Sequence, residues 1–63
     1  MSVGENIARM RENKGITQME LAEAIGVTQS MIGQIERGSK VPSIILANAI
    51  AKELGGDIRD IVQ

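Results

Sequence analysis

Uncharged hydrogen-bonding side chains gather between residues 28 and 37 of this chain. Gln29 and Gln34 each carry an amide with one acceptor and two donors, and the hydroxyl of Ser30 comes between them in the sequence. A glutamine amide can make a paired hydrogen bond with adenine in the major groove of a duplex. A serine hydroxyl can bond to a purine or a pyrimidine edge. These side chains could therefore read nucleic-acid bases, provided that the fold presents them outward.

The composition leaves few other chemistries open. The chain has no cysteine, no histidine and no aromatic residue, so thiolate nucleophiles, disulfides and the usual general base and metal ligand are excluded. Asp57 and Asp60 could be paired carboxylates, but their place directly after Gly55 and Gly56 is more typical of a helix start. We predict that the protein is not an enzyme, and we expect no cofactor, no metal and no small-molecule ligand in this domain.

Length and charge narrow the class further. With 63 residues, the chain is predicted to be a single domain over residues 1–63, burying about 60% of its unfolded surface. No apolar run approaches the roughly 20 residues that cross a bilayer, and the start lacks a signal peptide, so we expect a soluble cytoplasmic protein without membrane contact. The net charge is −1 and the pI is near 5.2. Any basic surface for nucleic acid must therefore be local.

Apolar residues recur at steps of three and four between glycines and capping residues, which predicts an all-α fold of five short helices. The first helix is expected after Ser2 and the second after Thr17, both with capping-box spacing, and the others after Thr28, Ser43 and Asp57. The expected ranges are residues 3–14, 18–25, 29–37, 44–54 and 58–62. Helices this short are marginal alone in water, so tertiary packing must hold them.

The helix over residues 29–37 is expected to have two distinct faces. At about 100° per residue, Met31, Ile32 and Ile35 fall on an inner arc. The outer arc holds Gln29, Ser30, Gly33, Gln34 and Arg37, and it includes no acidic side chain. A glycine inside a helix costs about 1 kcal/mol relative to alanine. Gly33 therefore either allows close approach of the backbone to DNA or is simply tolerated.

The helices over residues 18–25 and 29–37 are joined by a short turn, which requires a close crossing. Ala22 is small enough for that crossing, and Gly26 can adopt the positive φ that the turn needs. Leu21, Ile25, Val27, Ile32 and Ile35 are expected to fix the angle between the two helices. The chain resembles the Cro/CI-type, or XRE-like, helix-turn-helix family of lambdoid phage repressors. The matching residues are Gln18, Ala22, Gly26, Ile32 and Ile35, extended by Arg11, residues 15–18 and 35–38, Pro42–Ser43 and Leu54–Gly55.

This resemblance implies a five-helix domain with the helix-turn-helix at residues 18–25 and 29–37. The second of these helices would enter the major groove and the first would cross the DNA backbone. By matching position, Gln18, Gln29, Ser30 and Gln34 are implied groove or backbone contacts, and Thr28 and Lys40 are implied phosphate contacts. Gly33 and Arg37 complete the candidate DNA-binding set. The chain departs from the family at Gly33 and at Val41, where polar residues are common.

The resemblance also implies a structural ion pair between Arg11 and Glu36. This pair would tie the first helix to the third and account for an acidic side chain close to the DNA. The alternative is two separately solvated charges.

An exposed apolar surface is expected on the helix over residues 44–54. Ile44, Ala47, Ile50, Ala51 and Leu54 form its core arc, whereas Ile45 lies nearly opposite and Leu46 lies at the edge. Because family members dimerise near this helix and the last one, we expect a two-fold homodimer through Ile45, Leu46, Ile58 and Val62. Alternatively, the last helix packs over these residues within one chain.

Together these observations predict a sequence-specific transcriptional regulator of bacterial or phage origin, a repressor that binds a pseudo-palindromic DNA operator as a dimer. The alternative is a protein-interaction module that keeps the fold but binds a regulatory protein partner through its apolar surface. The chain could also be the DNA-binding part of a longer regulator. Side-chain identity does not fix the operator, because the shape and deformability of DNA also contribute.

Overall fold

The computed structural model describes residues 2–63, and its secondary structure over these residues is entirely helical. The five helices are α1 (Val3–Lys14), α2 (Gln18–Ile25), α3 (Gln29–Arg37), α4 (Ile44–Glu53) and α5 (Ile58–Val62). The all-α prediction and the expected helix starts are confirmed. The difference at the helix ends is small: α4 stops at Glu53, and Leu54 is its C-cap.

Local hydrogen bonds explain why the helices begin where they do. The Ser2 hydroxyl accepts a 3.1 Å bond from the N–H of Glu5, whose carboxylate accepts a 2.9 Å bond from the N–H of Ser2. Thr17 with Glu20 forms the same reciprocal capping box, and so does Asp57 with Asp60. These boxes satisfy backbone donors that a helix start otherwise leaves unpaired. Asp57 and Asp60 thus act as helix caps.

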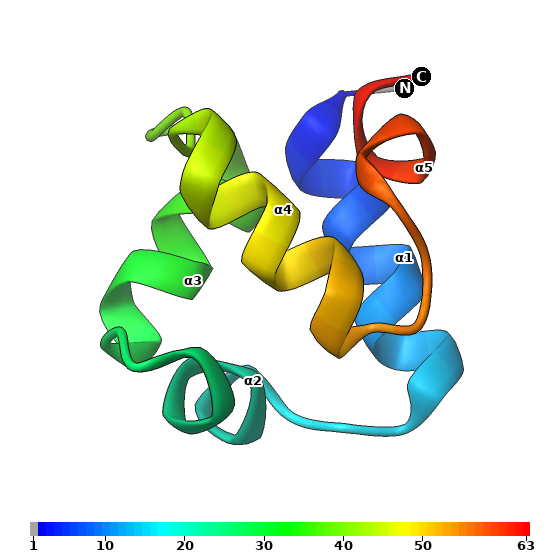
Figure 1. The fold of residues 1–63 in the computed structure, drawn as a ribbon. Coiled ribbons are helices and arrows are strands. Elements are labelled where there is room, and N and C mark those ends of the chain that lie inside the picture. Colours follow the sequence, from blue (N-terminus) through cyan, green and yellow to red (C-terminus); the bar gives the residue numbers. More distant parts are fainter. Residues whose placement is uncertain (1) are drawn as a thin grey trace.

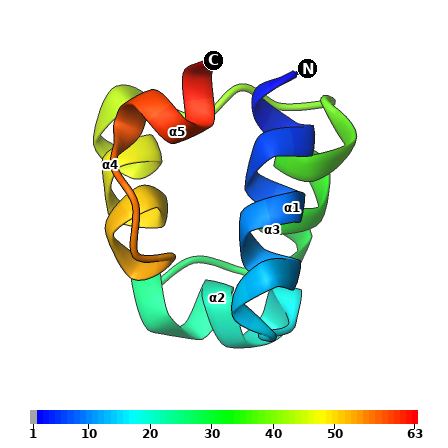
Figure 2. The same ribbon diagram turned by 90° about the vertical axis from the view of Figure 1, so that its right-hand side faces the viewer.

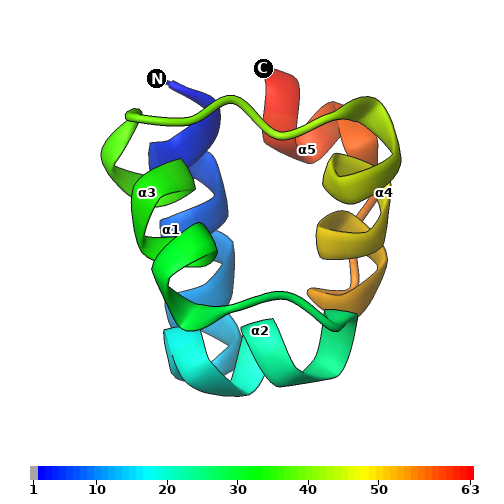
Figure 3. The ribbon, with the colours of Figure 1, turned by 90° about the vertical axis from the view of Figure 1, so that its left-hand side faces the viewer.

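The helices form two sides joined at both ends. α1 and α3 lie side by side and α4 lies opposite them, while α2 crosses one end and α5 the other (Figures 1 and 3). The start of α1 and the end of α5 lie at the same end of the molecule (Figure 2). Aliphatic side chains fill the space between the two sides. The fully buried large ones are Ile7, Leu21, Ile32, Ile35, Ile50 and Ile61.

α1 and α3 approach closely at Gly4. A Cβ at this position would overlap the carbonyl oxygen of Ile35 and would lie 2.7 Å from that of Glu36. Both obstructing atoms belong to the backbone of α3, so they cannot rotate away. Gly4 is therefore the residue that lets the two helices pack at this distance.

The predicted place of Ile44 on the core arc of α4 is wrong. Ile44 lies in the first turn of this helix and is 67% exposed. Its side chain lines a shallow hollow with Val3, Pro42 and Ile58, so it is covered on one side only. A helical wheel treats all turns alike, whereas the first turn of α4 lies at the margin of the core. None of the helices in residues 2–63 is long and apolar enough to span a membrane.

Candidate nucleic-acid interface

The helix-turn-helix is formed by α2, a turn over residues 26–28, and α3. Gly26 has φ of 77°, the left-handed conformation in which glycine is favoured. The hydroxyl of Thr28 then accepts a 3.1 Å hydrogen bond from the N–H of Met31 and starts α3. Ala22 is buried on the inner side of α2, as expected for a close helix crossing. One packed core therefore sets the direction in which α3 presents its outer side chains.

The outer side of α3 carries side chains that the fold does not use. Gln29 and Ser30 are exposed and Gln34 is half-buried. None of the three side chains makes a hydrogen bond to another residue within 2–63. Ile32 and Ile35 on the opposite side are buried. The predicted two-faced helix is therefore present, with its amide and hydroxyl groups available to a ligand.

Gly33 differs from its expected exposed position on the outer arc, because it is buried. A Cβ built on Gly33 would lie 3.0 Å from Nη1 of Arg37 and 3.6 Å from Oε1 of Gln18. Gly33 does lie on the outer side of α3, as the helical periodicity predicts. The periodicity does not show that longer side chains from other positions cover it. Arg37 and Gln18 lie over Gly33.

The Arg11–Glu36 ion pair is present and joins α1 to α3. Nε of Arg11 donates to Oε2 of Glu36 at 2.7 Å, and Nη2 donates to Oε1 at 3.1 Å. The third guanidinium nitrogen, Nη1, donates to the carbonyl of Ile16 at 2.9 Å. The side chains of Arg11 and Glu36 are only 12% and 7% exposed. The alternative prediction, that the two charges are solvated separately, is therefore wrong. The hydrogen bond to Glu36 raises the pKa of the Arg11 guanidinium above its usual value.

Gln18 belongs to the same network. Its Nε2 donates a 2.9 Å hydrogen bond to Oε1 of Glu36. Because an ionised carboxylate only accepts hydrogen bonds, this contact fixes which end of the amide faces Glu36. Gln18 is half-buried, and its hydrogen bond to Glu36 fixes its orientation. That Gln18 contacts DNA remains a prediction. The sequence carried no local signal for this hydrogen bond, which joins residues 18 positions apart.

The model of the family described as helix-turn-helix matches residues 7–61 of this chain. The chain belongs to the helix-turn-helix family. An HTH-type transcriptional regulator of Methanothermobacter thermautotrophicus is 48% identical over 56 residues, which cover 87% of this chain and 81% of that protein. The alignment of the family model includes all of α2, α3 and α4.

Two solved structures of similar proteins contain DNA. The P22 c2 repressor in complex with a synthetic operator has a TM-score of 0.93 and 27% identity, covering 100% of this chain and 96% of that chain. SinR, a master regulator for biofilm formation solved in complex with DNA, has a TM-score of 0.84 and 33% identity, covering 90% of this chain and 92% of that chain. The arrangement of the five helices is therefore that of phage-repressor-type helix-turn-helix domains.

The predicted phosphate contacts of this helix-turn-helix chain lie at its surface. Thr28 is exposed, and its hydroxyl keeps a donor hydrogen after accepting the N–H of Met31. Lys40 and Arg37 are exposed, and neither makes a side-chain hydrogen bond or ion pair within residues 2–63. Both cations are free to meet an anionic partner.

The predicted dimer residues differ in exposure. Ile45 is 80% exposed and Val62 is 57% exposed, whereas Leu46 is partly buried against the core and Ile58 is half-buried. α5 packs against α4, but it does not cover Ile45. Sequence reasoning missed Val41, which is 84% exposed, and Ile44. We call Val41, Ile44, Ile45 and Val62 the apolar end surface.

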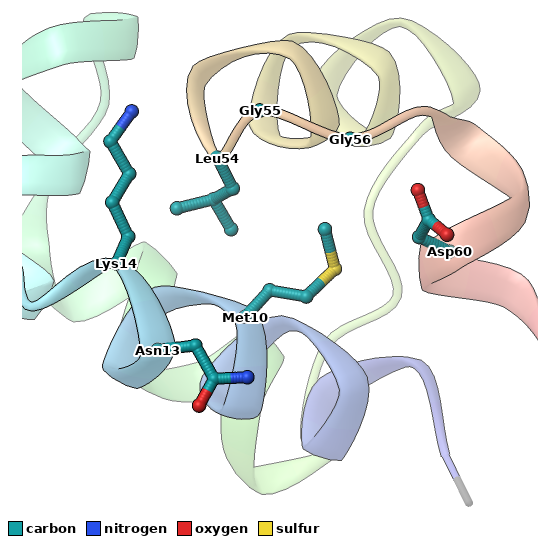
Figure 4. Close-up of a pocket in the computed structure, with 7 residues that line it drawn as sticks. All are labelled: Met10, Asn13, Lys14, Leu54, Gly55, Gly56 and Asp60. Carbon is teal, nitrogen blue, oxygen red and sulfur yellow. The ribbon is translucent and has the colours of Figure 1, made fainter.

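One hollow lies away from α3, between the end of α1 and the segment that joins α4 to α5 (Figure 4). Its volume is about 420 Å³, and Met10 and Leu54 point into it. Two of its polar groups are already engaged: Lys14 donates to the carbonyl of Glu53, and Asp60 accepts from the N–H of Asp57. No metal-binding group of three or more acidic, histidine or cysteine residues occurs within residues 2–63.

Proposed function

We propose that this chain is a sequence-specific DNA-binding transcriptional regulator, a repressor, whose residues 1–63 act as one domain. α3 enters the major groove, with Gln29, Ser30 and Gln34 facing base edges. The observation that carries this proposal is that these three side chains lie on the outer side of α3 and have no hydrogen-bond partner within residues 2–63. The P22 c2 repressor and SinR, which have the same arrangement of helices, were both solved in complex with DNA, and this supports DNA binding by this chain.

The local charge around α3 is compatible with DNA despite the net charge of −1. Glu36 is the one acidic residue between positions 28 and 40. It is directed inward, where Arg11 pairs with it. Arg37 and Lys40 remain as exposed cations. Because few cations face the DNA, we expect a shallow salt dependence, with a slope of about −0.9 for each phosphate neutralised.

Selection of bound duplexes from a random oligonucleotide pool tests this function. We expect a common site to be enriched. Gln29→Ala and Gln34→Ala should each weaken binding to that site by about 1–3 kcal/mol and relax specificity at the base pair that each residue contacts. Asn13→Ala, which removes an exposed amide on α1, is the matched control and should bind normally. Enrichment of no site, or unchanged binding by both glutamine variants, would refute the proposal.

We further propose that the regulator acts as a two-fold dimer through the apolar end surface. Four of the five exposed large apolar side chains belong to this surface, and contiguous exposed apolar surfaces are typical of protein interfaces. To read successive major grooves of a palindromic site, such a dimer must hold its two copies of α3 about 34 Å apart.

Sedimentation equilibrium at micromolar concentration tests the dimer, with interference detection because the chain has no tryptophan or tyrosine. We expect a dimer whose dissociation constant rises at least tenfold in Ile45→Asp. Met19→Asp changes the exposed apolar side chain outside the apolar end surface and should leave association unchanged. A monomeric unaltered protein would contradict this part of the proposal.

The second candidate function is a module that binds a regulatory protein partner. The apolar end surface and the acidic pI favour it. Substituting Gln29 and Gln34 separates the two functions, since loss of both amides should abolish regulation through DNA and leave a role based on a protein partner intact.

A further inference from the structure

We propose that Gly33 is a positioning residue: by lacking a side chain, it leaves a space in which the Arg37 guanidinium lies, and from there Arg37 binds a phosphate of duplex DNA. This inference rests on the proposed DNA-binding function. It assigns Gly33 a role different from close approach of its own backbone to DNA.

The space over Gly33 is occupied by Arg37. A Cβ on Gly33 would lie 3.0 Å from Nη1 and 3.8 Å from Cζ of Arg37. Residues 33 and 37 are one turn apart, and helical side chains lean toward the N-terminus of their helix, so Arg37 extends back over Gly33. Gly33 is buried as a result. Any side chain at position 33 would displace the guanidinium.

Arg37 takes no part in the side-chain hydrogen bonds and ion pairs that join residues 2–63. Arg11 is paired with Glu36, Arg59 is paired with Asp57, and Arg9 donates to Asn6. Arg37, in contrast, makes no hydrogen bond or ion pair to any residue within 2–63. Its guanidinium therefore keeps five donors for an external acceptor.

The direction of Arg37 favours phosphate as that acceptor. Gln18, the first residue of α2, places Oε1 3.6 Å from the same Cβ position of Gly33, so the guanidinium lies on the side of α3 that faces the start of α2. In a helix-turn-helix, the first helix of the pair crosses the DNA backbone. A guanidinium beside its N-terminus meets phosphate oxygens, which it can bind through two parallel hydrogen bonds.

The test is a double-mutant cycle on the selected duplex, with Gly33→Ala and Gly33→Val each made in the unaltered chain and in Arg37→Ala. We expect Arg37→Ala to weaken binding about tenfold, as for loss of a charged hydrogen bond. Gly33→Val should weaken it by a similar factor and Gly33→Ala by less. In the Arg37→Ala background, both substitutions at Gly33 should change the affinity less than about twofold, because their effect acts through the missing arginine.

The salt dependence gives a second readout. Arg37→Ala and Gly33→Val should each reduce the slope of log K against log salt by about 0.9, the value for one phosphate contact. Lys52→Ala removes an exposed cation of α4 outside the proposed interface, and it should leave affinity and slope unchanged. Nitrogen-15 relaxation of the DNA-free protein should show the Arg37 Nε–H ordered in the unaltered chain and mobile in Gly33→Val.

Three outcomes would overturn the inference. An equal loss from Gly33→Ala in both backgrounds would show that the backbone itself approaches DNA. A relaxed preference at one base pair with an unchanged salt slope would assign Arg37 to a guanine. An unaltered protein that binds no duplex would refute the proposed function as well, whereas the first two outcomes leave that function standing.

Discussion

The amide nitrogen of Asn6 donates a 2.7 Å hydrogen bond to the carbonyl oxygen of Ile61, joining the first helix to the last. The same nitrogen donates to the carbonyl of Gln63 at 2.9 Å, and Asn6 is only 2% exposed. Carbonyl groups at the end of a helix have no partner within that helix. Asn6 therefore replaces the C-terminal hydrogen bonds that a helix as short as α5 lacks.

Replacing Asn6 with alanine should destabilise the protein by about 2–3 kcal/mol, because the carbonyl of Ile61 loses its donor in a buried place and that of Gln63 in a partly buried one. Urea denaturation followed by circular dichroism at 222 nm measures this change. Asn13→Ala, on the exposed side of the same helix, should fall within about 0.5 kcal/mol of the unaltered protein. Equal stabilities for the two variants would contradict the proposed role of Asn6.

Gly4→Ala should destabilise the protein by about 3 kcal/mol, although alanine favours a helix over glycine by about 1 kcal/mol. The added methyl would meet the backbone of α3 at Ile35 and Glu36, so the two helices would have to separate. Gly33→Ala is the matched substitution, because its methyl would meet only side-chain atoms of Arg37 and Gln18. We expect Gly33→Ala to raise the melting temperature and Gly4→Ala to lower it. Changes of the same sign would count against this account.

Removing one member of the Arg11–Glu36 pair should cost about 3–5 kcal/mol, since the remaining charge would be left buried without its partner. Glu36→Ala should also release the Gln18 amide and so weaken DNA binding beyond the effect of lower stability. The double variant Arg11→Ala with Glu36→Ala should lose less stability than the sum of the single variants. Glu12→Ala is the control, since Glu12 is exposed and 3.9 Å from Arg11. Additive losses would show that the pair is not coupled.

Stability should fall in acid through the capping carboxylates. The pKa of Glu5 lies below its usual 4.5, chiefly because its carboxylate accepts the backbone N–H of Ser2, and secondarily because of the Ser2 hydroxyl. A folded-state pKa below the unfolded value contributes stability above about pH 4.5, and this contribution is lost as the pH falls through the lowered value. Melting temperatures from pH 7 to pH 2 should show Glu5→Gln less stable at neutral pH and equal to the unaltered protein in strong acid. A difference that does not change with pH would rule this mechanism out.

The sequence was sufficient to predict the helices, because the capping signals act within three or four residues. Ser2, Thr17, Thr28, Ser43 and Asp57 each begin a helix as predicted. The resemblance to phage repressors also implies the Arg11–Glu36 ion pair, although the two residues are 25 positions apart.

Features that depend on distant parts of the chain were not predictable in this way. The local pattern around Gly4 does not show that the backbone of α3 lies against it. Gly33 lies on the outward side of its wheel, but a wheel does not show that side chains of Gln18 and Arg37 cover it. Ile44 follows the apolar period of α4, but the core ends before its first turn. Each error arises where tertiary packing overrides a local pattern.

Gln29, Ser30 and Gln34 make no side-chain hydrogen bond within residues 2–63, and this bears on how such a repressor can diversify. Because the framework does not rely on these three groups, polar replacements there leave the folding equilibrium nearly untouched. Variants from a library randomised at these positions alone can therefore bind new operators while keeping nearly the same melting temperature. Gln18 does not share this freedom, since its partner also anchors α1 to α3.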